Sequence, residues 1–375
     1  MGPLGVWIAH LRGLPVPSLA TTLLIYLPNY TCGLMAVTPS ILFHRMGRRL
    51  REARELGSYE LVEQLGAGGM GEVWRARHRL LAREAAIKLV RPEMLGAGSG
   101  EEARMLLRRF EREAQATAQL SSAHTIRLFD FGSTDDERFY YVMELLVGRD
   151  LESFVKEFGP IPADRAMFLL RQVCHSLAEA HDRGLIHRDI KPANIYLCRM
   201  GLDYDFIKVL DFGLVKFNVD ESAARTQTMM TAALGTMGTP AYMAPEIIMA
   251  RGEIDRRADV YALGCVAYFI LTGQRVFDGN TPMQALIDHV HTVPTPPSRR
   301  STLLIPPELD DIVMQCLEKD PAKRPQDAMK LGRMLDTCQT CNAWSSAKGA
   351  EWWRMNLPDL AAPLTFLDEP SALVN

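Results

Sequence analysis

Short apolar segments with alternating spacing occupy the chain from residue 59 to about residue 143, and longer segments with helical spacing follow them. Alternation is typical of half-buried strands, and it predicts strands at Tyr59–Leu65, Glu72–Arg77, Ala85–Val90, Ile126–Phe131 and Phe139–Met143. Apolar positions three and four residues apart indicate helices, which we expect at Glu101–Leu120, Pro162–Arg183, Arg256–Thr272, Pro306–Glu318 and Pro325–Asp336. The pattern predicts an α+β fold in which a small sheet with one main helix precedes a larger, mostly helical part.

The first 57 residues do not follow this pattern. No charged residue occurs from Gly13 to Phe43, a stretch longer than the ~20 apolar residues that cross a bilayer. Basic residues follow directly, at Arg45, Arg48, Arg49, Arg51 and Arg54. Because a basic cluster marks the cytoplasmic side of a membrane, we expect a span within residues 1–57 of an inner or plasma membrane, with the rest of the chain in the cytoplasm.

Several residues interrupt this apolar stretch, namely Pro15, Pro17, Pro28, Pro39 and Asn29–Thr31. The alternative interpretation is therefore an upstream extension or a wrongly chosen start codon, and the protein would then be cytoplasmic. The uncharged run from Val260 to Gln274 has only 15 residues. We expect a buried core helix there, because the run is too short to span a bilayer.

Composition narrows the class of protein only modestly. Of the 375 residues, 47% are hydrophobic and 23% are charged, which is ordinary for a globular protein with a sizeable core. The net charge of −3 gives no overall attraction to nucleic acid, and we expect no such partner. Seven scattered cysteines suggest buried thiols in a reducing compartment. Cys338 and Cys341 form a lone C-x-x-C, for which a coincidence at a helix end is favoured over zinc or redox use.

The densest reactive cluster is the sequence HRDIKPAN at residues 187–194, which two short apolar strands separate from DFG at residues 211–213. A hydroxyl that attacks a metal-bound triphosphate needs a proton acceptor, here Asp189, and a cation on the transferring phosphoryl group, here Lys191. Asn194 and Asp211 supply hard oxygen ligands suited to Mg²⁺. The two motifs resemble the catalytic loop and the metal-binding loop of protein kinases. This resemblance implies ATP and Mg²⁺ as cofactors.

The sequence LGAGGMGEV at residues 65–73 contains G-x-G-x-x-G, which dinucleotide-binding turns share with kinases. The dinucleotide alternative requires a helix after the glycines, whereas strand-forming Val73 and Trp74 follow here, so we predict a hairpin. Glycines let backbone N–H groups approach a triphosphate, and Val73 would pack on the adenine. The expected nucleotide-binding residues are Leu65, Gly66, Ala67, Gly68, Gly69, Met70, Gly71, Glu72 and Val73.

Lys88 lies in the expected strand Ala85–Val90, where its ammonium group would hold the α- and β-phosphates. An anionic partner has to fix this lysine, and Glu111 and Glu113 in the expected helix are the candidates. Two helical positions differ by about 200°, so only one of the two can face the cleft. Resemblance to the Arg-Glu-Ala pattern of bacterial kinases favours Glu113, and Glu111 would then be solvated.

Residues 59–335 resemble a bacterial Hanks-type serine/threonine protein kinase through the sequences GAGGMG, IKPAN and TPAYMAPE. The resemblance implies a two-lobed kinase fold, with a small antiparallel β lobe at 59–143, a hinge at 144–148 and a mostly helical lobe at 149–335. Residues 336–375 would form a tail of unknown role. The resemblance also implies that Met143 borders the pocket behind the adenine and that the Glu144 carbonyl and the Leu146 N–H bind the base. Ala85 departs from the usual valine without affecting the chemistry.

Two features imply that the phosphate acceptor is serine or threonine in a protein. Lysine at position 191 resembles serine/threonine kinases, whereas tyrosine kinases usually differ there. The segment from Thr239 to Glu246 resembles a platform for protein substrates, with Thr239 near Asp189, and argues against a small-molecule kinase. Glu246 would form a structural ion pair with Arg324 that anchors this segment to the helical part.

The resemblance places an activation segment at residues 211–246. Arg188 implies control by phosphorylation, because its guanidinium group can bind a phosphate and order this segment. The candidate sites are Thr226, Thr228, Thr231 and Thr236, of which Thr231 is preferred. A homodimer that phosphorylates itself in trans is compatible with this regulation. The alternative function is a membrane-anchored pseudokinase or scaffold that binds ATP without turnover. Such a protein would normally lack one of Lys88, Asp189, Asn194 and Asp211, and all four are present.

Removal of the apolar N-terminal segment tests the expected membrane span. We expect the full-length protein to sediment with membranes and a chain that begins at Arg54 to remain in the supernatant, because the shortened chain lacks the run from Gly13 to Phe43. Membrane fractionation followed by immunoblotting measures the distribution of each chain. Equal distributions of the two chains would contradict the span.

Overall fold

The computed structural model describes residues 8, 10–13, 18, 55–68, 71–90, 111–112, 114–134, 138–212, 240–250, 254–279, 281–338 and 343–361. The chain divides into two compact units, residues 1–62 with 76–83 and residues 63–75 with 84–375. In the first unit, the ring of Tyr59 meets the ring of His78 edge-on at 4.9 Å. The described candidate site residues discussed below all lie in the second unit.

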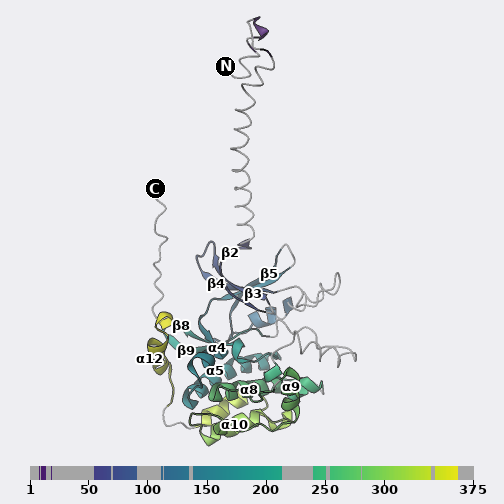
Figure 1. Cartoon of the computed structure of the whole chain (residues 1–375), viewed down its shortest axis with the longest axis vertical. Coiled ribbons are helices and arrows are strands. Elements are labelled where there is room, and N and C mark those ends of the chain that lie inside the picture. Colours follow the sequence, from purple (N-terminus) through teal and green to yellow (C-terminus); the bar gives the residue numbers. More distant parts are fainter. Residues whose placement is uncertain are drawn as a thin grey trace. The chain divides into compact units, whose positions relative to one another are not determined.

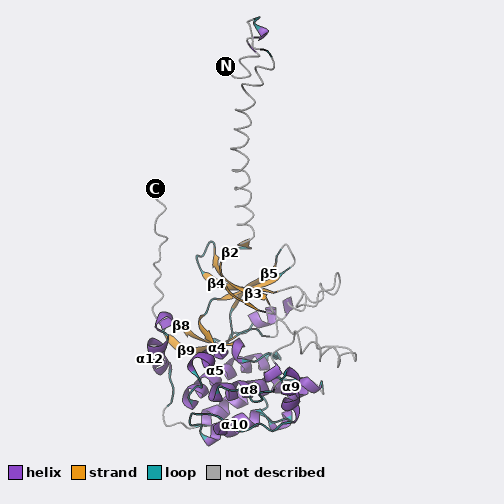
Figure 2. Ribbon diagram, viewed as in Figure 1, coloured by secondary structure: helices purple, strands orange, loops and turns teal. Residues whose placement is uncertain are grey.

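A six-stranded sheet, drawn orange in Figure 2, has the strand order β1-β2-β3-β4-β6-β5. Its strands are β1 (Glu55–Leu56), β2 (Tyr59–Gly68), β3 (Gly71–His78), β4 (Glu84–Val90), β5 (Leu128–Ser133) and β6 (Phe139–Glu144). The pairs β4–β6 and β5–β6 are antiparallel. Five of these strands were predicted from alternation, and the predictions are confirmed with shifts of a few residues at their ends.

A second, three-stranded sheet has the order β7-β8-β9, and both of its pairs are antiparallel. Its strands are β7 (Val147–Asp150), β8 (Ile195–Met200) and β9 (Asp203–Val209). The segment 144–148, expected as an extended connector, therefore ends within β7. Gly148 is required there, because a Cβ atom at this position would lie 2.1 Å from the carbonyl oxygen of Leu197.

Helices dominate the chain after β7, as predicted (Figure 2). They are α4 (Leu151–Phe158), α5 (Ala163–Asp182), α7 (Pro245–Met249), α8 (Arg257–Thr272), α9 (Pro282–His291), α10 (Pro307–Cys316), α11 (Ala328–Thr337), α12 (Ser346–Asn356) and α13 (Pro358–Ala361). Short 3₁₀ turns are η2 (Pro192–Asn194), η3 (Pro240–Tyr242), η4 (Pro297–Arg299) and η5 (Pro321–Lys323). Of the helix expected at Glu101–Leu120, the structure describes residues 111–112 and 114–120, which are helical up to residue 118.

The main core surrounds α8, which packs against α5, α10 and α11 (Figure 1). Every residue of α8 from Ala258 to Thr272 is buried. A helix that is apolar on all sides belongs in a core, so the interpretation of this run as a core helix is confirmed. The helix ends at Gly273, whose φ of 72° is the left-handed conformation that glycine adopts readily at this position.

Five described cysteines, Cys174, Cys198, Cys265, Cys316 and Cys338, are buried free thiols. This agrees with the expectation of buried thiols, whereas Cys341 lies outside the described residues, so the C-x-x-C pair cannot be compared. Within the described ranges, no helix has the length and apolar character to cross a bilayer. The predicted span lies outside those ranges, apart from Gly13 and Ser18.

The tail that the sequence left without a role contains α12, which packs on β9 (Figure 1). Asp205 of β9 is fully buried and forms a two-point ion pair with Arg165 of α5, with N–O distances of 2.8 and 2.7 Å. The indole N–H groups of Trp344 and Trp353 donate to the same carboxylate at 2.7 and 2.8 Å. The tail therefore supplies two of the hydrogen bonds that compensate a buried charge.

Aromatic rings complete this cluster around Arg165. Its guanidinium carbon lies 4.1 Å from the ring centre of Trp352 and 4.9 Å from that of Phe154. Trp352 also contacts the rings of Phe154 and Phe158 in α4. On α12, Gly349 faces Asp205, and a Cβ atom there would lie 3.1 Å from its carboxylate. We call these contacts of residues 343–361 with Arg165 and Asp205 the tail clamp.

Replacement of Trp353 by alanine tests the contribution of the tail clamp to stability. We expect Trp353→Ala to lower the free energy of unfolding by about 3 kcal/mol, because a fully buried indole and a hydrogen bond to a buried carboxylate are both lost. Met355→Ala, on the same helix but 69% exposed, is the matched control. Urea unfolding followed by circular dichroism measures both, and equal small losses would contradict the role of the clamp.

Candidate active site

The segment 187–194 lies between α5 and β8, and the carboxylate of Asp259 holds its start in place. Asp259, on α8 and 1% exposed, accepts hydrogen bonds from the backbone N–H groups of His187 and Arg188, each at 2.8 Å. It also bonds Nε2 of His181 at 2.9 Å. Burial by itself raises the pKa of Asp259, but the hydrogen bond and charge of His181 outweigh it and hold the pKa below its ordinary value. The loop is thus tied to the centre of the core.

Two residues of the site have backbone angles that side chains disfavour. Arg188 has φ of 62° and Asp211 has φ of 58°. Such left-handed conformations of residues other than glycine carry strain and occur often at functional sites. The backbone N–H of Arg188 is held by the carboxylate of Asp259, and the side chain of Asp211 is held by Lys88. These contacts maintain the two left-handed conformations.

Asp189 is surrounded by the two polar residues predicted to act with it. Lys191 Nζ donates to Asp189 Oδ2 at 2.9 Å, and Asn194 Nδ2 donates to the same oxygen at 3.0 Å. Asn194 Nδ2 also donates to the backbone oxygen of Asp189 at 2.9 Å. The backbone of Asn194 is joined to the segment that follows β9, because its carbonyl oxygen accepts from the N–H of Leu210 at 2.9 Å.

Lys88 of β4 and Asp211, which follows β9, form an ion pair with Nζ and Oδ2 2.5 Å apart. The hydroxyl of Tyr141 donates to the other carboxylate oxygen, Oδ1. Burial alone would raise the pKa of Asp211, but the charge and hydrogen bond of Lys88 and the hydroxyl of Tyr141 lower it below the ordinary value. The pKa of Tyr141 is raised well above its ordinary value by burial and by Asp211, so its hydroxyl remains a proton donor.

Imidazole and phenyl rings connect the two loops. The ring of His187, which is fully buried, lies 4.6 Å from the ring of Phe212. Its Nε2 bonds the carbonyl oxygen of Leu210 at 2.8 Å, and the N–H of Asp189 donates to its Nδ1 at 3.3 Å. Burial lowers the pKa of His187, which favours the neutral ring that this pattern of one donor and one acceptor requires.

A small pocket lies beside Asp189 and Lys191. Tyr242 and Met243, which precede α7, and Ile247 of α7 also line it. The predicted acceptor-facing residue Thr239 lies outside the described residues. The pocket shows that a chain segment next to α7 contributes to the surroundings of the candidate proton acceptor.

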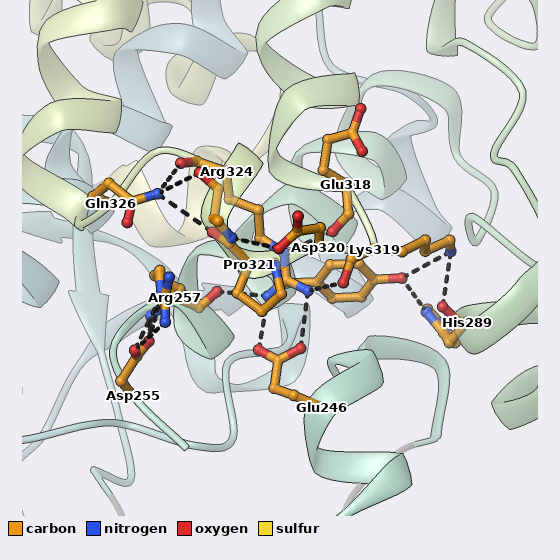
Figure 3. A network of polar contacts seen from close by, with 12 residues as sticks. Glu246, Asp255, Arg257, His289, Glu318, Lys319, Asp320, Pro321, Arg324 and Gln326 are labelled. Atoms are coloured by element: carbon orange, nitrogen blue, oxygen red, sulfur yellow. Dashed lines mark hydrogen bonds and ion pairs between the residues drawn. The ribbon is translucent and has the colours of Figure 1, made fainter. Parts of the chain in front are cut away.

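The predicted ion pair between Glu246 and Arg324 is confirmed. Two nitrogens of the 1% exposed Arg324 donate to the two carboxylate oxygens of Glu246 at 2.7 and 2.9 Å. Further N–H groups of Arg324 donate to the backbone oxygens of Glu318, Lys319 and Arg257, as Figure 3 shows. The pair therefore fixes the start of α7 to the segment between α10 and α11.

The glycine-rich segment forms a hairpin rather than a strand–helix turn, as predicted, because β2 ends at Gly68 and β3 begins at Gly71. Gly71 has φ of 144°, and a Cβ atom there would lie 1.9 Å from the carbonyl oxygen of Leu89. Leu65, Gly66 and Ala67 are exposed on β2. Glu72 and Val73 lie on β3, whereas Gly69 and Met70 are outside the described residues.

The segment expected to bind adenine is held by residues that sequence reasoning did not identify. Met143 is 6% exposed in the small core under the sheet, and Leu146 packs against that core. Glu144 Oε1 accepts from Lys208 Nζ at 2.6 Å and from the backbone N–H of Arg127 at 2.9 Å. The side chain of Glu144 is therefore used for structure.

Some predictions lie outside the described residues, namely those for Glu113, Gly213, Thr226, Thr228, Thr231, Thr236 and Thr239. In the described residues, Asp211 is an acidic partner of Lys88. The pairing of Lys88 with Glu113 stays a prediction. Asp259 was missed, although its sequence signal was present as the single acid next to an uncharged apolar run. The contacts of Tyr141 with Asp211 and of Lys208 with Glu144 were not predicted, because they depend on strand register and loop packing.

The donor set fits Mg²⁺. Within the described ranges, no group of three His, Cys, Asp or Glu side chains is arranged to hold a metal. Mg²⁺ needs no such group, because one or two protein oxygens and the phosphates of a nucleotide commonly hold it. Asp211 offers an ionised carboxylate, and Asn194 offers its Oδ1 because its Nδ2 donates to Asp189.

Comparison with known proteins agrees with this geometry. The protein kinase domain family matches residues 59–334. A probable serine/threonine-protein kinase of Corynebacterium efficiens is 37% identical over 308 residues, which cover 80% of this chain and 44% of that protein. Serine/threonine-protein kinase PknB of Mycolicibacterium smegmatis is 39% identical, over 73% of this chain and 41% of that protein. The chain thus spans less than half the length of these curated relatives.

Among solved structures, the crystal structure of Rad53 1-466 in complex with AMP-PNP is similar to this chain. The TM-score is 0.57 at 26% sequence identity, and the match covers 74% of this chain and 64% of that chain. The similarity therefore extends to the arrangement of strands and helices described above.

Substitution of Asp259 tests whether a buried charge maintains the loop at residues 187–194. We expect Asp259→Asn to lower the free energy of unfolding at pH 7 by about 3 kcal/mol, because two backbone donors lose an ionised acceptor. The folded pKa of Asp259 is lowered. Its stabilisation is therefore fully present above the unfolded value of about 3.9 and is lost as the pH falls through the lower folded value.

The difference in stability between wild type and Asp259→Asn should accordingly shrink as the pH falls below about 4. Urea unfolding at a series of pH values measures it. Asp311→Asn, at an exposed position on α10, is the matched control and should differ little from wild type at every pH. A difference for Asp259→Asn that is independent of pH would contradict the proposed charge effect.

Proposed function

This chain belongs to the protein kinase family, as a bacterial Hanks-type serine/threonine kinase, and from that premise we propose that it transfers the γ-phosphoryl group of ATP to serine or threonine hydroxyls of proteins. The observation that carries the proposal is the ion pair between Lys88 and Asp211, with Nζ and Oδ2 2.5 Å apart. This contact joins residues 123 positions apart in the sequence. It brings the candidate phosphate-binding cation beside the candidate metal ligand.

In the proposed mechanism, Asp189 orients the acceptor hydroxyl and takes up its proton. Lys191, 2.9 Å from Asp189, stabilises the negative charge on the transferring phosphoryl group. Lys88 holds the α- and β-phosphates, and Glu113 is its proposed second partner. Asn194 and Asp211 hold Mg²⁺, which neutralises charge on the phosphate oxygens when it is bound.

For the nucleotide, we propose that the glycine-rich hairpin covers the phosphates through residues 65–73. Met143 borders the adenine pocket, and the Glu144 carbonyl and the Leu146 N–H bind the base. The side-chain bond between Glu144 and Lys208 supports this assignment because it fixes the backbone of the connecting segment. The crystal structure of Rad53 contains AMP-PNP, an observation on that protein that supports a nucleotide site in a similar fold.

For substrates and control, we propose protein acceptors that bind beside Asp189 next to the α7 segment. Phosphorylation of the activation segment, with Thr231 as the first candidate and Arg188 as the phosphate-binding residue, would regulate the enzyme in bacterial signalling. A homodimer that phosphorylates itself in trans and membrane attachment through residues 1–57 complete the proposal. The kinase unit would comprise lobes at 59–143 and 149–335 joined by a hinge at 144–148.

Substitution of the two central charged residues tests the proposed activity. We expect Asp189→Asn and Lys88→Met each to reduce autophosphorylation by at least about a hundredfold, because the first removes the proposed proton acceptor and the second removes the cation proposed to hold the α- and β-phosphates. Asp311→Asn and Lys330→Met, both at exposed positions, are matched controls that should retain activity. Mass spectrometry after incubation with Mg²⁺ and ATP measures phosphorylation and identifies the sites.

The outcome separates an enzyme from a scaffold. Sustained autophosphorylation by Asp189→Asn would contradict the role of Asp189. Nucleotide binding by the wild-type protein without any phosphorylation of itself or of added protein substrates would favour the alternative of a pseudokinase that binds ATP without turnover.

A further inference from the structure

Asp211 is held from two strands at once. Lys88 on β4 donates to Oδ2 at 2.5 Å, and the hydroxyl of Tyr141 on β6 donates to Oδ1. The antiparallel register of these strands places Lys88 directly opposite Tyr141. Residues opposite each other on paired strands project from the same face of the sheet. The sheet therefore presents one cation and one hydroxyl together to a single carboxylate.

The position of Tyr141 does not require a hydroxyl for packing. Tyr141 is 1% exposed, and its ring belongs to the small core with Ala86, Val90 and Met143. An aliphatic side chain or phenylalanine would fill such an environment without bringing a polar group that needs a partner. One partner of the Tyr141 hydroxyl is Asp211, the residue proposed to bind Mg²⁺.

The two hydrogen bonds fix the orientation of the carboxylate without saturating it. An ionised carboxylate has about four lone-pair sites on its two oxygens, and Lys88 and Tyr141 use one site on each oxygen. The side chain of Asp211 retains 19% of its surface exposed, so further lone pairs are accessible. With one donor on each oxygen, rotation of the carboxylate about its last bond would break both bonds.

We propose that Tyr141 is a positioning residue for the metal: its hydroxyl orients the Asp211 carboxylate so that the remaining lone pairs meet Mg²⁺ together with Asn194. This inference rests on the proposed kinase function and adds a residue that acts through Asp211. Outer residues that orient metal ligands typically contribute ten- to a hundredfold to metal affinity. The geometry thus assigns to Tyr141 a contribution to Mg²⁺ affinity and not to nucleotide affinity.

Calorimetric titration of the purified full-length protein tests this assignment. We expect Tyr141→Phe to raise the dissociation constant for Mg²⁺, measured at saturating ADP, by about tenfold or more. The affinity for ADP in the presence of EDTA should remain unchanged, because the hairpin and the connecting segment are untouched. The Mg²⁺ concentration required for half-maximal autophosphorylation should rise by a similar factor.

Tyr140→Phe is the matched control. Tyr140 is the neighbouring residue on β6, is also buried and faces the opposite side of the strand. Its hydroxyl lies near Gly132 instead, within 2.8 Å of the position that a Cβ atom there would occupy. We expect the Mg²⁺ and ADP affinities of Tyr140→Phe to match those of wild type, and thermal unfolding to show that both variants fold.

Four outcomes are decisive. Weaker Mg²⁺ binding by Tyr141→Phe with unchanged ADP affinity supports the proposal. An unchanged Mg²⁺ affinity, or an equal loss of Mg²⁺ and ADP affinity that indicates a general disturbance of the pocket, overturns it. If wild type binds neither ADP nor Mg²⁺ with ADP, the proposed kinase function fails first, and this result is distinguishable from a failure confined to Tyr141.

Discussion

The carboxylate of Asp259 is buried beside His181, and the loop at residues 187–194 depends on it. A buried charge is costly unless hydrogen bonds compensate it, and two of the partners of Asp259 are backbone N–H groups of the loop itself. The loop therefore cannot move away without removing two of the hydrogen bonds that compensate this charge. Such an interaction adds little net stability compared with an apolar residue, but it restricts the loop to one arrangement. The left-handed backbone at Arg188 is maintained by this restriction.

Little-exposed ion pairs between distant segments recur elsewhere in the described chain. Glu246 with Arg324, Asp205 with Arg165, and Asp211 with Lys88 are ion pairs with small exposed fractions, and each joins segments far apart in the sequence. The first fixes the end of the activation segment, the second fixes β9 to α5, and the third joins the sheet to the site. Apolar packing alone is non-directional, whereas these paired charges and their hydrogen bonds specify distance and orientation at the residues that would contact ATP and substrate.

Local patterns predicted most strands and the long helices, because alternation and helical spacing report directly which face is buried. The Glu246–Arg324 pair was also predictable, since both residues belong to motifs that resemble known ones. The contact of Tyr141 with Asp211 was not, because it depends on the register of β4 against β6 and on where the chain after β9 returns. In the sequence, Asp259 stands out as a single acid next to an uncharged apolar run. Its hydrogen bonds to the loop at residues 187–194, however, depend on how α8 packs against that loop. The tail showed several tryptophans, but a sequence does not state which buried charge they surround.

The tail clamp bears on where this catalytic unit ends. The family match stops at residue 334, but Trp344 and Trp353 complete the hydrogen bonding of Asp205, and Trp352 covers the guanidinium group of Arg165. Asp205 lies on the strand that leads to Asp211, and Arg165 lies on the helix that leads to the catalytic loop. A fragment that ended at residue 334 would expose to solvent the ion pair between Arg165 and Asp205, which is buried in the full chain. Sequence similarity and physical self-sufficiency therefore define two different domain limits in this protein, and the second reaches at least to Trp353.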